Sequence, residues 1–166
     1  VLKTAKLLFP RRYAWMFTTL VVFLPGNVIL YSYVNCDALA MCSTAIIFYS
    51  WVKAYKEGWS WTTCAVSAVG MGICFLSYYN AYGFILMTFF YFVGTMLTDQ
   101  SKPVKERWKE MIQKGLFILV IVCVIALWWF IRNAILYGGD FLGRQASSAS
   151  AELYARYQYK PSHSKT

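Results

Sequence analysis

The chain of 166 residues is 59% hydrophobic and 14% charged, whereas soluble domains have about 45–50% apolar and about 25% charged residues. So few charged side chains do not cover a soluble fold, which excludes the soluble globular and disordered classes. The 16 basic and 7 acidic residues give a net charge of +9. The basic residues lie between apolar runs, and no nucleic-acid-binding motif accompanies them. We therefore expect an integral membrane protein in contact with the lipid bilayer and no nucleic-acid partner.

Long apolar runs predict the fold class. A helix that crosses about 30 Å of hydrocarbon needs about 20 apolar residues. We expect an all-α, polytopic helical membrane protein with about five transmembrane helices. The expected spans are Tyr13 to about Tyr33, about Ala38 to Tyr55, Trp61 to Tyr79, Ala81 to Leu97, and Gly115 to Ile131 with an extension to Leu136. Pro25 interrupts the first run and predicts a kink or an end there.

The distribution of basic residues predicts the orientation. Eleven of the 16 Lys and Arg residues lie before the first run, between the second and third, or between the fourth and fifth. The other five follow the fifth run, and the loops around Asn35–Asp37 and Tyr79–Asn80 contain neither Lys nor Arg. The positive-inside rule then predicts a cytoplasmic N-terminus and an extracytoplasmic C-terminal tail.

These boundaries divide the chain into three parts. Residues 1–12 form a basic cytoplasmic lead-in, residues 13–136 a transmembrane helical bundle, and residues 137–166 an extracytoplasmic loop or tail. Within the bundle, residues 99–114 form a cytoplasmic connector, either a short amphipathic interfacial helix or a solvated link. The chain begins with Val and ends in polar sequence, so we expect a truncated fragment of a larger polytopic protein.

Two local patterns predict packing in the third run. Ala68 and Gly72 lie four residues apart on one helical face, where small side chains allow another helix to approach closely. Trp59 and Trp61 stand at the start of the run. Tryptophan favours the headgroup zone, so we expect both rings at the membrane interface.

Soluble-enzyme chemistry has little support. The one histidine, His163, lies in the polar tail, and none of the five cysteines forms a CxxC pair. We therefore predict no metal site built on a histidine cluster, no structural disulfide and no nucleophile–histidine pair.

The first polar site follows the first span, at Asn35 and Asp37. An aspartate before a helix can cap the free N–H groups of the helix. A carboxylate at a membrane surface can instead activate an acceptor hydroxyl or bind a divalent cation. The sequence is consistent with both roles of Asp37, the helix cap and the functional carboxylate.

The second polar site ends the fifth span, at Arg132 and Asn133. A cation there can snorkel to the interface and balance the helix C-terminus. A guanidinium can also hold a phosphate in a bidentate fork. Because the Gly138-Gly139-Asp140 turn follows at once, the segment is also consistent with a pocket for a lipid phosphate.

Three sequence motifs resemble those of polytopic GT-C glycosyltransferases, which take a sugar from a polyprenyl-phosphate carrier outside the cytoplasmic membrane. The chain looks closest to an uncharacterised bacterial branch of that group. The motifs are Asn35-Cys36-Asp37-Ala38-Leu39, similar to "N-x-D-A-L"; Gly70 to Ala81, similar to "GlalGLalLsKyna"; and Trp128 to Asn133 with Tyr137 to Gly143, similar to "WW-x-x-RN-x-x-x-YGDPLG". The resemblance spans about residues 15–145.

The resemblance implies a glycosyltransferase of the bacterial cytoplasmic membrane. Its partners would be a polyprenyl-phosphate-linked sugar and a glycan or lipid acceptor. Asp37 would be the catalytic residue visible here, with no certain cofactor beyond an optional divalent cation. The substrate-binding residues implied are Asn35, Tyr78, Asn80, Arg132, Asn133 and Asp140. Tyr78 stands where the family has a lysine, which leaves Arg132 as the visible phosphate contact.

Two other functions remain as alternatives. A transporter or flippase would have discontinuous helices, for which Pro25-Gly26 is one candidate. A non-catalytic membrane scaffold subunit would tolerate replacement of Asp37 and Arg132.

Overall fold

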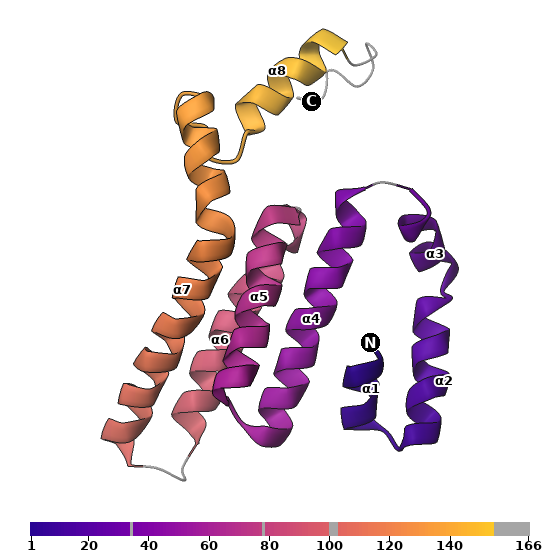
Figure 1. The fold of residues 1–166 in the computed structure, drawn as a ribbon, viewed down its shortest axis with the longest axis vertical. Coiled ribbons are helices and arrows are strands. Elements are labelled where there is room, and N and C mark those ends of the chain that lie inside the picture. The colour runs from indigo at the N-terminus through magenta and orange to yellow at the C-terminus, as the bar shows by residue number, and fades with distance from the viewer. Residues whose placement is uncertain (34, 78, 100–102, 155–166) are drawn as a thin grey trace, which may run out of the picture. The chain divides into compact units, whose positions relative to one another are not determined.

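The computed structural model describes residues 1–33, 35–77, 79–99 and 103–154, and every regular element in these ranges is helical (Figure 1). The elements are α1 (Leu2–Leu8), α2 (Arg11–Val22), α3 (Pro25–Tyr31), α4 (Cys36–Glu57), α5 (Trp61–Ser77), the 3-10 helix η1 (Tyr79–Ala81), α6 (Tyr82–Thr98), α7 (Val104–Leu136) and α8 (Arg144–Tyr154). The chain forms two units, Val1–Ala126 and Leu127–Thr166, and α7 belongs to both. The all-helical fold class is confirmed for the described residues.

Three stretches are long and apolar enough to cross a membrane. They are α4 with 22 residues, η1 plus α6 with 20, and α7 with 33. The bent pair α2–α3 counts as a fourth if it is a single span. The third expected run forms α5, an apolar helix of 17 residues, at the lower limit for a span. A multi-pass membrane fold is therefore supported, whereas five full spans and the orientation of the termini stay predictions.

The first run bends at its proline, as expected. The axes of α2 and α3 differ by 63°, and Pro25 is the first residue of α3. Proline has no N–H to continue the hydrogen bonding of α2. The side-chain amide of Asn27 donates instead to the carbonyl of Val21 at 2.7 Å. The bend is thus closed by a local side-chain hydrogen bond.

Glycines bring α5 close to its neighbours on two sides. A Cβ on Gly70 would lie 3.0 Å from Ile47 of α4, and one on Gly72 would lie 2.9 Å from Ile125 of α7. Ala68, one turn before Gly72, is fully buried. The close approach predicted from the Ala68/Gly72 spacing is confirmed, and Gly70 adds a second contact on the opposite face.

Tryptophan and tyrosine link α6 to α4 and to the turn before α5. Trp51 donates its indole N–H to Thr88 at 3.1 Å, and Tyr91 donates to the carbonyl of Trp51 at 3.2 Å. Trp59 donates to Thr95 at 2.8 Å and is 5% exposed. Trp59 thus packs inside the bundle against α6, while the position expected for it at the membrane interface stays a prediction.

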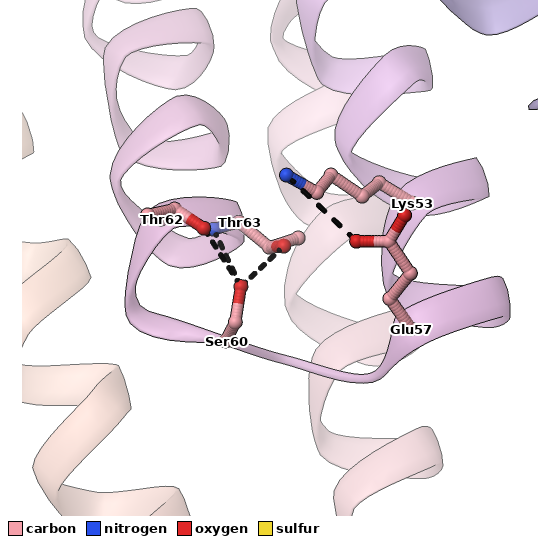
Figure 2. A network of polar contacts seen from close by, with 5 residues as sticks. All are labelled: Lys53, Glu57, Ser60, Thr62 and Thr63. Carbon is pink, nitrogen blue, oxygen red and sulfur yellow. Dashed lines mark hydrogen bonds and ion pairs between the residues drawn. The ribbon is translucent and has the colours of Figure 1, made fainter.

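The turn between α4 and α5 carries its own polar contacts (Figure 2). The Ser60 hydroxyl accepts from the N–H of Thr63 at 3.2 Å and lies 2.9 Å from the Thr63 hydroxyl. Ser60 therefore satisfies a free donor at the start of α5. On the last turn of α4, Lys53 and Glu57 form an ion pair at 3.9 Å.

The connector expected over 99–114 is helical from Val104 and continues without a break into the last apolar run. It is therefore the first part of α7 and not a separate short helix. Arg107 donates to the carbonyl of Leu97 at the end of α6 at 2.5 Å. Lys114, one of the basic residues between the fourth and fifth apolar runs, is 8% exposed and is paired with Glu110. The end of α7 at Leu136 matches the longer of the expected boundaries.

Candidate functional site

The start of α4 holds two of the expected site residues. Asn35 is the N-cap, in an extended backbone conformation, and its side-chain oxygen accepts from the N–H of Asp37 at 2.5 Å. Asn35, and not Asp37, is therefore the residue that caps α4. Asp37 lies in the first turn, where the helix dipole favours a negative charge. No described residue forms a hydrogen bond or ion pair with its partly exposed carboxylate.

Asn80 lies at the same end of the first unit as Asn35. It belongs to η1, which follows α5, and its side chain is exposed. Figure 1 shows the start of α4 and the end of α5 side by side, as expected for two antiparallel neighbours. Tyr78 lies outside the described residues. The structure thus places the Asn35 and Asn80 segments at one end of the bundle.

The second unit begins with the last turns of α7 and a glycine turn. Gly138 and Gly139 have φ angles of +59° and +99°, which a side chain rarely allows. The N–H of Gly139 donates to the carbonyl of Ala134 at 2.9 Å and closes the end of the helix. The expected break after the fifth run is confirmed at these glycines.

Asp140 caps the following helix. Its carboxylate accepts from the N–H groups of Gln145 at 2.7 Å and Ala146 at 3.2 Å, both in the first turn of α8. A carboxylate at a helix N-terminus satisfies two free donors and interacts favourably with the dipole. In this structure Asp140 therefore organises the turn.

Asn133 fastens the same turn to α7. It is 5% exposed, and its side-chain amide donates to the carbonyl of Phe141 at 3.3 Å. Gly143 has a φ of +65°, and a Cβ placed on it would lie 4.0 Å from the nitrogen of that amide. Asn133 and Asp140 together fix the path of the chain from α7 into α8.

Arg132 contacts an aromatic ring, whereas Asn133 and Asp140 form hydrogen bonds with the backbone. Its guanidinium carbon lies 5.1 Å from the centre of the Trp129 ring, and the residue is exposed. It forms no hydrogen bond or ion pair with any described residue. Stacking on an aromatic ring orients a guanidinium while its five N–H donors stay free.

Two grooves of contrasting polarity share Arg132. One has a volume of about 370 Å³ and is lined by Trp129, Arg132, Asn133, Tyr137, Leu142, Gly143, Ala146, Ser147 and Ser150. The other, of about 500 Å³, is lined by Trp128, Ile131, Arg132, Ile135 and Leu136, so Arg132 is the only charged side chain among the described residues that line it. We call these the polar groove and the apolar groove. Arg132 thus lies at the border of the polar groove, which is lined by hydroxyl groups, and the apolar groove, which is lined by apolar side chains.

The serines of the polar groove were not identified from sequence. Ser147 and Ser150 line it from α8, where a spacing of three residues places both on one helical face. The signal was present in that spacing. It was missed because residues 137–166 were expected to be a loop or tail and not to contain a helix.

Metal ligands do not gather in the described part of the chain. No group of three or more His, Cys, Asp or Glu side chains is close enough there to hold an ion.

No family model, curated protein or solved structure matches the chain. The resemblance to GT-C glycosyltransferases consequently stays a prediction from motifs.

Proposed function

We propose that the chain is part of an integral membrane glycosyltransferase of GT-C type. It would move a sugar from a polyprenyl-phosphate donor to a glycan or lipid acceptor at the outer face of the bacterial cytoplasmic membrane. The observation that carries the proposal is the position of Arg132 between the polar and apolar grooves. A lipid-linked sugar phosphate has the same order of parts: hydrocarbon, phosphate, sugar.

Arg132 is assigned to the donor phosphate. Its guanidinium has no carboxylate partner among the described residues and is supported from one side by Trp129. Guanidinium pairs with phosphate through two parallel hydrogen bonds, which orient the phosphate as well as neutralise it. The serines of α8 would then face the sugar, since hydroxyls can both donate and accept.

Asp37 is assigned as the base. In the proposed reaction an acceptor hydroxyl oxygen attacks the anomeric carbon and the carbon–oxygen bond to the phosphate breaks. The hydroxyl proton passes to the Asp37 carboxylate, and the polyprenyl phosphate leaves with the bonding electron pair. A positioned base contributes about 10²–10⁴-fold to such a step. Asn35 accepts a hydrogen bond from the backbone N–H of Asp37 and thereby holds the backbone of Asp37 in the first turn of α4.

A transporter or flippase is the second candidate. The observation that favours it is the 63° bend between α2 and α3, because transporters often build their sites from broken helices. The two candidates differ in one product: a transporter moves a lipid-linked sugar without forming a new glycosidic bond.

The test compares strains that carry the full-length parent protein as wild type, a deletion, Asp37→Asn or Arg132→Ala. Surface glycans and lipid-linked sugars are measured by mass spectrometry, and membrane abundance by blot. We expect the glycan to lose one sugar in the deletion. Asp37→Asn should lower transfer about 10²–10⁴-fold and Arg132→Ala about 10²–10³-fold.

Lys56→Ala is the matched control, since it removes an exposed cation from a different helix end. It should leave transfer unchanged. Normal glycans in the deletion strain would overturn the proposal. Purified protein that flips the lipid-linked sugar without transferring it would establish the transporter instead.

A further inference from the structure

Helices α1 and α2 form a hairpin with four basic residues. The helices pack against each other and are joined through Phe9 and Pro10. We call residues 1–22 the basic hairpin; its cations are Lys3, Lys6, Arg11 and Arg12. The proposed function does not use this part of the chain.

The packing of the hairpin turns its cations outward. Thr4 and Ala5 of α1 and Ala14 of α2 are buried, and α1 also packs against α4. All four cations are exposed. The buried side is made of small residues, so the long basic side chains occupy the free side.

Acidic residues do not offset this charge. The first acidic residue of the chain is Asp37, and none of the four cations has an ion-pair partner among the described residues. Basic residues elsewhere in the unit do have such partners, as in the pairs Lys53–Glu57 and Lys114–Glu110. The hairpin is thus a surface of uncompensated positive charge.

The basic residues stand beside exposed rings. Lys6 places its ammonium 5.6 Å from the centre of the Trp15 ring, and the rings of Phe9 and Phe17 are 5.5 Å apart. Tyr13 and Trp15 are 57% and 50% exposed. Exposed tryptophan and tyrosine next to cations are typical of a helix that meets a membrane interface.

Exposed aliphatic surface continues from the cations along α2. Met16 and Leu20 are 60% and 63% exposed, one and two turns beyond Arg12. A ligand that matches the cations and the apolar surface beside them has an anionic group joined directly to hydrocarbon. An acidic protein or a nucleic acid matches the charge but not the adjoining apolar face.

We propose that the basic hairpin binds the headgroup phosphates of anionic phospholipids in the leaflet at this end of the bundle. Figure 1 shows that the α1–α2 turn, the α4–α5 turn and the start of α7 lie at one end of the first unit. Each cation near an anionic membrane surface contributes about fivefold in affinity. Neutralising three of them therefore predicts roughly a hundredfold loss at low salt, and less at high salt.

The experiment uses the whole purified chain in detergent with equal amounts of phosphatidylglycerol and phosphatidylcholine. Native mass spectrometry measures which lipids stay bound. The test variant is Lys6→Gln/Arg11→Gln/Arg12→Gln. The control is Lys53→Gln/Lys56→Gln/Lys109→Gln, which removes the same number of positive charges from the last turns of α4 and the first turns of α7. Circular dichroism checks that both variants keep their helix content.

We expect the wild type and the control to retain phosphatidylglycerol preferentially and the test variant to lose this preference. Equal retention of both lipids by the wild type would overturn the proposal. So would an equal loss in the test and control variants, because the charge would then act without a defined surface. Displacement of the lipid by inorganic phosphate at the same concentration would identify a simple anion site and would also overturn it.

Discussion

In α4 and α5, serine and glycine allow helices to pack closely, whereas after α7 the glycines form a turn and the serines of α8 line a groove. Ser43, Ser50 and Ser67 are fully buried, and the hydroxyls of Ser43 and Ser50 donate to carbonyls of their own helix. Ser147 and Ser150 line an open groove instead. A hydroxyl that is satisfied within its own turn acts as a small spacer, and one facing a groove is available to a ligand.

The glycines differ in the same way. Gly70 and Gly72 have ordinary helical backbones and matter because a Cβ would collide with a neighbouring helix. A Cβ on Gly138 or Gly139 would meet nothing within 4 Å, so these two glycines matter because of their positive φ angles. Residue type alone therefore does not distinguish the two units; the surroundings do.

The largest expected effect is at Gly72. Gly72→Val places methyl groups where Ile125 already lies, so we expect a loss of about 3 kcal/mol in stability. Thermal unfolding in detergent measures it. Gly83→Val is the control, since Gly83 has nothing within 4 Å, and Ile125→Ala should restore part of the loss. A neutral Gly72→Val would contradict the close approach of α5 and α7.

A leucine placed at one serine of each kind tests the comparison directly. Ser43→Leu forces a large side chain into a fully buried position and should cost about 2 kcal/mol. Ser147→Leu occupies an exposed position and should change stability by less than about 0.5 kcal/mol. It should nevertheless weaken binding of lipid-linked sugar, measured by native mass spectrometry. Equal destabilisation in both variants would remove the distinction.

A smaller effect is expected at the cap of α8. Asp140→Ala leaves two N–H groups of the first turn without their acceptor and should cost about 1 kcal/mol locally. Hydrogen exchange at Gln145 and Ala146 should become about fivefold faster. Asp140→Asn keeps an acceptor oxygen and should show less of the change. Unaltered exchange in Asp140→Ala would mean that the carboxylate does not cap α8.

The smallest effect is expected at Trp59. Trp59→Phe removes the hydrogen bond to Thr95 while keeping an aromatic ring, and buried side-chain hydrogen bonds in membrane proteins average about 0.6 kcal/mol. Trp61→Phe is the matched control, because Trp61 is 52% exposed. Thermal unfolding of the two variants should differ by that small amount. If Trp61→Phe were the more destabilising change, the assignment of the buried tryptophan would be wrong.

Features that depend on nearby residues were predictable from the sequence. The apolar runs of α4, α6 and α7, the bend at Pro25 and the break at Gly138-Gly139 each follow from a local stretch of chain. The close approach at Gly72 also followed, because small residues on one helical face have few other uses in a membrane.

Features that depend on contacts between distant residues were not predictable from the sequence. Trp59 is buried because Thr95, 36 positions later, offers an acceptor on α6. Asp140 is a cap because α8 exists, and α8 is rich in serine and alanine with no long apolar run to reveal it. Asn35, and not Asp37, caps α4 because the helix begins two residues earlier than a cap at Asp37 would place it.

The bend at Pro25 has a consequence for the order of events during synthesis. The side-chain hydrogen bond that closes it joins two residues of one seven-residue stretch, Val21 and Asn27. Contacts so close in sequence cost little chain entropy to form. This hydrogen bond can therefore form before α4 leaves the ribosome, and we expect α4 to pack against a segment that already bends at Pro25.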